Sequence, residues 1–582
     1  MRGFSWTSAS RRRMGMGALR AFSALTAVLG ASEALAQSGS GAIFESVMKP
    51  RDWGSYVGCD GYGAPTREGD GMTHFAMNLR VFNVPGQGNT MRQDASFAGE
   101  GVVDCDSALA ALPAKHWRRR VSLYTARAVH DLERRDARQA LIDVERAQAA
   151  AQAQADPFYA RSMGLNLEFV RAYALRQAGR SGEAHDLALH ALQARPFRKR
   201  ASLATAQAIG LDSDDTTTAE LLRRGAALDP HELDRLFQWE VSRGDFTEAE
   251  KVWPGLIPPR GREAPPEMTE AEFRQDQRIG VALFWMSRDC QHAYVLAALH
   301  RTEEAQAALA AARKRLEAAT QNLIDTGRGR EADEHILEAN ANARARNIAE
   351  PEFKRYGLLI AAWRTLLAGR PAEAMESVRD LPIDAFRHDL DVAALAALGQ
   401  SPPSELSASA ITEATDNEVT SLWKNNLAEI ESAERLPGHP GLLNPAGHAA
   451  VRELASNAHD PAPPEPGAVR IHSHLQRGPT LDMVGDLVLL RAAEVGREQG
   501  KKGMIILRRN DVRHIFNTYD VSTPVRSDPT GFESDIDVLY VDPASLPAAY
   551  AATPWRVLDV DAVYADLAPI YRREPSRSGH LL

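Results

Sequence analysis

The spacing of apolar and polar positions through the middle of the chain is typical of α-helices. From about Asp106 to Gly399 one helical pattern follows another, with short breaks apart from a proline-rich gap at Pro254–Pro266. Alanine supplies many of the apolar positions, and aromatic residues make up only 7% of the chain. We therefore expect helices that pack closely through small side chains.

The pattern changes after the segment Asp460–Gly467, whose prolines are typical of a semi-rigid linker. Val469–Leu475 is predicted as a strand, and Thr480 can cap a helix that runs to about Gly500. The apolar face of this helix contains Leu481, Val484, Val488, Ala492 and Val495. Two further strands and a closing helix are predicted at Met504–Leu507, Ile536–Tyr540 and Asp559–Tyr571. Residues 468–582 are thus predicted to form a small α/β domain, after a helix and proline-rich linker in 401–467.

The first residues have the pattern of a secretory signal peptide. A basic block at Arg11–Arg13 precedes an apolar stretch at Ala21–Ala31, and Ala34-Leu35-Ala36 supplies small residues before Gln37. The apolar stretch is about half the roughly 20 residues that a spanning helix needs. We expect cleavage after residue 36 and a mature protein in the periplasm or outside the cell. The alternative is a short amphipathic helix that belongs to the mature protein.

The net charge of the chain limits the classes of partner that we expect. Without residues 1–36 the chain has 63 basic and 76 acidic side chains, a net charge of −13. Nucleic acids and anionic lipid surfaces both select for basic proteins. We therefore expect neither nucleic acid nor a simple lipid surface as the partner, and no later segment is apolar enough to span a bilayer.

The three cysteines have different settings. Cys59 and Cys105 flank a glycine-rich segment, residues 37–105, which holds 12 of the 41 glycines and one predicted strand at Phe75–Val81. In an oxidising compartment these two cysteines are expected to pair. Cys290 lies within a helical pattern, where a small buried apolar residue is a simpler interpretation than a reactive thiol.

A short sequence motif recurs in the helical region. Gly179, Gly244 and Gly369 each precede an alanine by five residues, and looser copies surround Ala140, Ala219 and Ala305. Glycine accepts the left-handed backbone at a helix end, and alanine lets two antiparallel helices approach closely. A single helix pair buries too little apolar surface, so neighbouring pairs are expected to stack.

This motif resembles tetratricopeptide repeats, in which a glycine ends the first helix and a proline follows the second, as at Pro196 and Pro382. The resemblance covers residues 106–400 and implies an α-solenoid of helix pairs with a groove. The anchor alanines are spaced by 44, 35, 30, 56 and 69 residues, whereas the family repeat is about 34. We therefore expect five to seven degenerate pairs; the alternative is an irregular helical domain. The segment Leu489–Glu494 also resembles small α/β domains of bacterial envelope lipoproteins.

Motifs for chemistry are few. The chain has no nucleophile elbow, phosphate-binding loop or zinc-protease helix, so no catalytic residue, metal or cofactor is assigned. The strongest metal candidate is His472 with His474, with His514 as a third ligand; the alternative is the polar face of an edge strand. The acidic residues around 528–537 are typical of a solvated loop, with calcium binding or a glycosidase carboxylate pair as alternatives.

The sequence thus predicts a mostly helical interaction scaffold that binds a protein or peptide in the cell envelope. The alternative is an enzyme or cation-binding module in residues 468–582, with the repeats as a targeting arm. Because the first helix of each pair lines the groove in the family that the repeats resemble, the resemblance implies these partner-binding residues: Tyr124, Arg127, Asp131, Glu168, Arg171 and Arg176.

Overall fold

The computed structural model describes residues 51–60, 64–65, 101–152, 159, 163–210, 216–257, 270–320, 330–382, 385–400, 449–452, 466–476, 481–520 and 523–571. The predicted signal peptide, the predicted strand at Phe75–Val81 and most of the predicted linker lie outside these residues.

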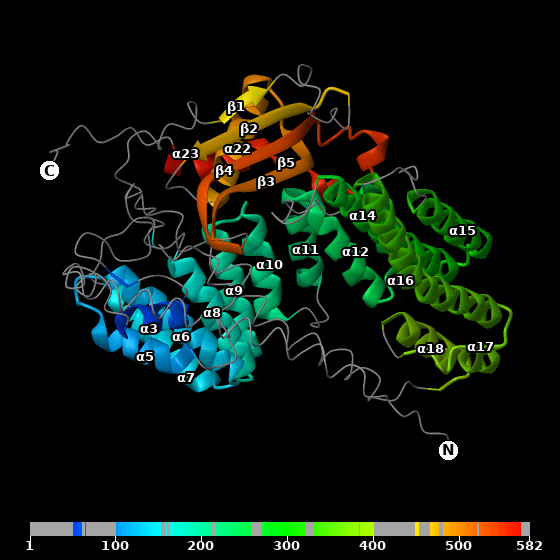
Figure 1. Cartoon of the computed structure of the whole chain (residues 1–582), viewed down its shortest axis with the longest axis horizontal. Helices are drawn as coiled ribbons and strands as arrows, with labels where there is room; N and C mark the ends of the chain where they lie inside the picture. The colour runs from blue at the N-terminus through cyan, green and yellow to red at the C-terminus, as the bar shows by residue number, and fades with distance from the viewer. Residues whose placement is uncertain are drawn as a thin grey trace.

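Every regular element described before residue 449 is a helix, which confirms the prediction of a mostly helical chain (Figure 1). The helices are α3 (Arg51–Asp60), α5 (Gly101–Ala111), α6 (Trp117–Glu133), α7 (Ala137–Gln152), α8 (Met163–Gln177), α9 (Ser181–Ala194), α10 (Lys199–Ile209), α11 (Thr216–Leu228), η2 (Pro230–Glu232), α12 (Leu233–Ser242), α13 (Phe246–Val252), η3 (Trp253–Gly255), α14 (Glu270–Ala298), α15 (Thr302–Ala319), α16 (Arg330–Leu367), α17 (Pro371–Ser377) and α18 (Ala385–Ala397).

Successive helices pack against each other in pairs, from α6 with α7 and α8 with α9 to α16 with α17. The predicted anchor alanines lie where the second helix of a pair meets the first. Five of them are fully buried, namely Ala140, Ala184, Ala249, Ala305 and Ala374. Small side chains thus allow the close approach that the alanine-rich sequence predicts.

The turns within these pairs share one backbone geometry. Gly179, Gly244 and Gly369 have φ values of +77°, +71° and +76°, the left-handed region that favours glycine. After Gly179, the Arg180 amide donates to the carbonyl of Leu175, which closes the end of α8 in a Schellman motif. The predicted role of these glycines as helix terminators is confirmed.

Two looser copies of the motif have the same turn geometry with a residue other than glycine at the turn. Arg135 has φ +61° and His300 has φ +66°, and each precedes its anchor alanine by five residues. The amides of Asp136 and Arg301 again donate to carbonyls five residues back. The repeat is therefore more regular in backbone than in sequence.

The C-terminal region forms an antiparallel sheet covered by helices. Its strand order is β1-β2-β4-β3-β5, and all neighbouring strands are antiparallel. The elements are β1 (Ala449–Arg452), β2 (Val469–Gln476), α22 (Leu481–Glu498), β3 (Gly503–Asp520), β4 (Thr523–Val541), η6 (Ala548–Tyr550), η7 (Pro554–Arg556), β5 (Leu558–Asp559) and α23 (Val560–Tyr571). Each predicted strand and helix after residue 468 is present, but β3 and β4 are a long hairpin instead of two short strands. We call residues 466–571 the sheet unit.

The sheet unit shares a hydrophobic core with the middle of the helical region, beside which it lies in Figure 1. Ala227 and Leu228 of α11 are buried among residues of α22 and the strands. Arg195, just after α9, donates from Nη2 to Asp486 Oδ2 of α22 at 2.5 Å, and both side chains are almost completely buried. The two parts of the chain therefore pack as one body in this region.

The first described helices are joined covalently. Cys59 of α3 and Cys105 of α5 form the predicted disulfide, with an S–S distance of 2.04 Å. The neighbouring Asp60 carboxylate is fully buried and accepts from Arg119 and Ser122 of α6. Cys290 is buried as predicted, and burial raises the pKa of its thiol to about 12, as expected for an inert side chain.

Candidate functional site

Two of the predicted groove residues lie inside the helical region. Arg127 is 9% exposed, and its Nε and Nη2 atoms each lie 2.6 Å from an oxygen of Asp143 on α7. Its Nη1 atom contacts Asp106 of α5. Asp131 is 2% exposed, one turn further along α6. The charge of Arg127 is therefore neutralised within the fold, and the Asp131 side chain is buried.

Burial changes the acidity of Asp131. Desolvation, together with the negative charges of Asp143 and Asp136, raises the pKa of Asp131 to about 6. Its Oδ2 atom has no hydrogen-bond partner among the described residues. The native state therefore favours a protonated Asp131 and is destabilised when this carboxyl ionises.

Replacing Asp131 with asparagine is expected to raise the free energy of unfolding near pH 7.5 by about 1–2 kcal/mol. Because the native pKa is raised above the ordinary 3.8, native protein binds the extra proton between about pH 4 and 6. Stability falls as pH rises through this window, and the gain from asparagine should vanish at about pH 4. Denaturant unfolding of the wild-type and variant chains at about pH 7.5 and about pH 4 measures this gain in the free energy of unfolding. Asp380→Asn, at a side chain that is 99% exposed, is the control; equal gains at both pH values would exclude ionisation as the cause.

The other predicted groove residues are half-buried. Tyr124 lies with its ring centroid 5.3 Å from the Arg127 guanidinium, and Arg176 lies 4.7 Å from the ring centroid of Tyr173. Arg171 is on α8, where its charge acts on Glu168. Glu168, on the same helix as Arg171 and Arg176, lines a cavity.

This cavity, which we call the α8–α9 hollow, has a volume of about 390 Å³. It is lined by Gln148 of α7, by Gly164, Leu167 and Glu168 of α8, by His190, Gln193 and Ala194 of α9, and by Tyr159. Gly164 has a steric role, because a Cβ atom there would lie 2.8 Å from the Tyr159 carbonyl oxygen and 2.9 Å from its ring. Glycine thus lets Tyr159 close one side of the hollow.

The polar groups in the hollow are partly desolvated. Burial raises the pKa of Glu168, while the nearby charges of His190 and Arg171 lower it. Burial and the Glu168 carboxylate raise the pKa of Tyr159 to about 12. The Tyr159 hydroxyl has no hydrogen-bond partner among the described residues. An N–H donor or a cation that enters the hollow would therefore gain an acceptor at Glu168 and a partner at Tyr159. The sequence contains no motif that identifies Tyr159 or His190.

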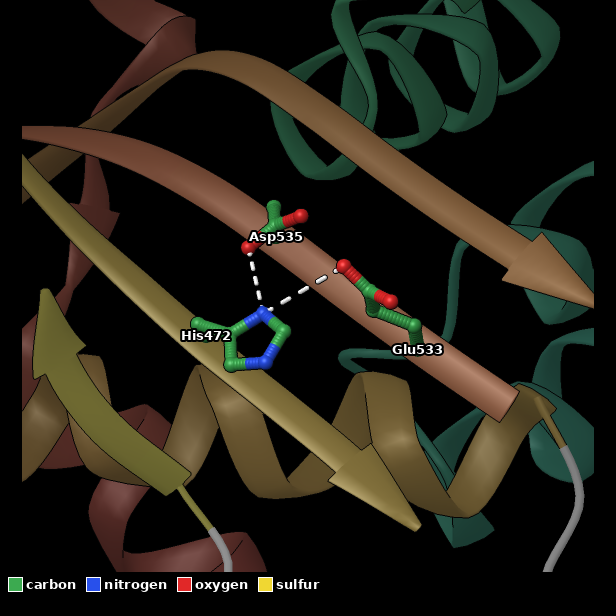
Figure 2. Close-up of side chains that lie close together, drawn as sticks. All are labelled: His472, Glu533 and Asp535. Carbon is green, nitrogen blue, oxygen red and sulfur yellow. Dashed lines mark hydrogen bonds and ion pairs between the residues drawn. The ribbon is translucent and has the colours of Figure 1, made fainter. Parts of the chain in front are cut away.

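The predicted histidine pair lies on the sheet unit. His472 and His474 lie on one face of β2, as predicted, and are opposite Asp535 and Glu533 of β4 in the register of the sheet. Figure 2 shows His472 directed toward the two carboxylates. His472 Nδ1 is 2.7 Å from Asp535 Oδ1 and 3.5 Å from Glu533 Oε1. His514 instead has Gly531 as its neighbour on β4. Glu533 and Asp535, two of the acidic residues that the sequence suggests as a separate site, thus lie beside the histidines.

The predicted carboxylate pair of a glycosidase does not share one site. Asp537 is 1% exposed and accepts two hydrogen bonds from Arg470, at 2.6 and 2.8 Å. Asp535 contacts His472 instead. Because Asp537 is neutralised by a buried guanidinium, it is a poor general acid or base partner for Asp535.

Comparisons with protein families, curated proteins and solved structures find no match to this chain. Among the described residues, none of the helices combines the length and hydropathy that crossing a lipid bilayer requires. Two candidate sites in the described residues are the α8–α9 hollow and the group of His472, Glu533 and Asp535 on the sheet unit.

Proposed function

We propose that this chain is an exported interaction protein of the bacterial cell envelope, whose helix pairs stack as a tetratricopeptide-like solenoid and bind a partner protein. The observation that carries the proposal is the α8–α9 hollow, which holds a partly desolvated Glu168 within a helix pair. The five identical turns with a buried alanine support the repeat character. The signal-like residues 1–36 and the Cys59–Cys105 disulfide support export.

The chemistry of the hollow favours a basic side chain of the partner. Glu168 supplies a carboxylate, Tyr159 a hydroxyl, and Leu167 an apolar wall beside them. A lysine or arginine side chain can place its aliphatic stem on such a wall and its charge on the carboxylate. The expected occupant is therefore an exposed segment of a partner protein with at least one basic residue.

Reversing the charge at Glu168 is expected to weaken partner binding about tenfold or more while the helical content stays unchanged. The measurement is site-specific photocrosslinking in the native cell, with the photoreactive residue at Gln193, which lines the hollow. The crosslinked partner is identified by mass spectrometry, and its yield is compared between the wild-type chain and Glu168→Lys.

The matched control is Glu183→Lys, which makes the same charge change on α9 at a side chain that is 61% exposed and outside the hollow. Equal crosslink yields for Glu168→Lys and Glu183→Lys would contradict the proposal. Arg127 is unsuitable for such a test because its replacement would remove two of the hydrogen bonds that the buried Asp143 accepts. Deleting residues 468–582 is equally unsuitable, because it would uncover Ala227 and Leu228.

A further inference from the structure

We infer that strands β2 and β4 build a binding site for a divalent transition-metal ion of the zinc class, with His472, Glu533 and Asp535 as ligands (Figure 2). One ligand atom from each of these residues lies within 4.8 Å of the other two. This site is separate from the α8–α9 hollow and does not depend on the proposed partner binding.

The distances between ligand atoms fit a small metal ion. Zinc binds imidazole nitrogen and carboxylate oxygen at about 2.0–2.2 Å in tetrahedral geometry, so its ligand atoms are separated by about 3.4 Å. His472 Nδ1 lies 2.7 Å from Asp535 Oδ1 and 3.5 Å from Glu533 Oε1, on either side of that value. Small rotations of the side chains would bring all three atoms to bonding distance without moving a strand.

The register between β2 and β4 determines the positions of these side chains on the sheet. His472 is directly opposite Asp535, and His474 is directly opposite Glu533, so the four residues form two adjacent cross-strand pairs on one face. Ile471, the residue before His472, is buried in the core with α22, which places the two pairs on the opposite face. His474 Nδ1 lies 3.6 Å from Glu533 Oε2, so His474 is a neighbour of one ligand and lies outside the group of three.

The local charge also favours a cation. Two carboxylates face one imidazole, whereas the next pair along the same face, Arg470 with Asp537, neutralises itself. Arg508 of β3 lies near Asp537 at 3.7 Å, so its charge is also directed to that pair. The side chains of His472, Asp535 and Glu533 are only 13%, 18% and 21% exposed, which strengthens their interaction with a bound ion.

The ligand types select among metals. Calcium and magnesium prefer sets made of oxygen alone, whereas imidazole with carboxylates suits zinc and neighbouring transition metals. Another histidine–carboxylate contact, between His292 and Glu250 at 2.6 Å, lies in the helical region. There the Arg301 guanidinium lies 2.7 Å from the same carboxylate. His472 differs from His292 in that it contacts two carboxylates, those of Asp535 and Glu533.

The test uses the full chain, stripped of metal with a chelator and titrated with Zn²⁺ against a chromophoric competitor. We expect one Zn²⁺ per chain, and Asp535→Asn and Glu533→Gln should each weaken its binding about 100-fold. Co²⁺ should give the intense visible absorption of a tetrahedral ion with the wild-type chain and lose it with Asp535→Asn. His474→Gln, which removes a neighbour that orients Glu533, should weaken Zn²⁺ binding about tenfold.

His292→Gln is the matched control, because it removes a histidine from a carboxylate contact outside the site and should leave Zn²⁺ affinity unchanged. Circular dichroism and thermal melting of the metal-free variants separate lost ligands from lost folding. The inference is overturned if the folded wild-type chain takes up no stoichiometric Zn²⁺. It is also overturned if Asp535→Asn and Glu533→Gln, folded by these measures, bind Zn²⁺ as tightly as wild type.

Discussion

Replacing Arg195 with methionine is expected to lower the free energy of unfolding by about 3–5 kcal/mol. Arg195 is 1% exposed, and its Nη2 donates to Asp486 on α22, which also accepts from the Tyr571 hydroxyl at 2.8 Å. Methionine fills much of the arginine volume but leaves the Asp486 carboxylate buried without its cation. Because this ion pair joins the helical region to the sheet unit, the loss of stability should affect both parts of the molecule.

Denaturant unfolding followed by circular dichroism measures the effect. The double variant Arg195→Met/Asp486→Leu should recover part of the loss, since an apolar pair of similar volume replaces a buried ion pair at little cost. Arg180→Met, which breaks an ion pair with half-exposed side chains on Arg180 and Glu183, is the control and should change little. If Arg195→Met is no more destabilising than Arg180→Met, the ion pair does not hold the two parts together.

Removing the disulfide is expected to cost about 4 kcal/mol, the chain-entropy value for a loop closed across 46 residues. The Cys59→Ala/Cys105→Ala chain should lose the docking of α3 first, because the disulfide holds Asp60 beside Arg119. The measurement is the shift in denaturant midpoint between oxidised and reduced wild-type protein.

Cys290→Ala is the control for this experiment, since it removes the buried free thiol and should leave the response to reductant unchanged. Thiol labelling of the unfolded, unreduced wild-type chain should then modify Cys290 alone. Three labelled cysteines would refute the pairing, and a midpoint that is insensitive to reductant would refute its contribution to stability.

The helices and their turns can be predicted from local sequence patterns. Glycine at a left-handed position and alanine at a close contact between helices have direct steric causes. Arg135 and His300 escaped this reasoning, since positive φ is uncommon for residues other than glycine. The length of β3 and β4 was also missed, because polar residues such as Asp535 interrupt the apolar pattern on their partly exposed face.

The sites depend on contacts that no local pattern contains. Arg127 has the same appearance on a helical face whether it points to solvent or to Asp143 on the next helix, 16 residues away. His472 and Asp535 are 63 residues apart, and only the register between β2 and β4 brings them together. The sequence identified both histidines and both acidic residues, but it gave no means of assigning them to one site.

The contact between Arg195 and Asp486 joins residues that are 291 positions apart in the sequence. Arg195, Ala227 and Leu228 thus make these contacts with a segment that is synthesised much later. A premature stop between α11 and α22 would leave the Arg195 side chain without the Asp486 carboxylate and would expose the apolar surface of Ala227 and Leu228. Nonsense mutations near the end of the gene should therefore damage the middle of the protein.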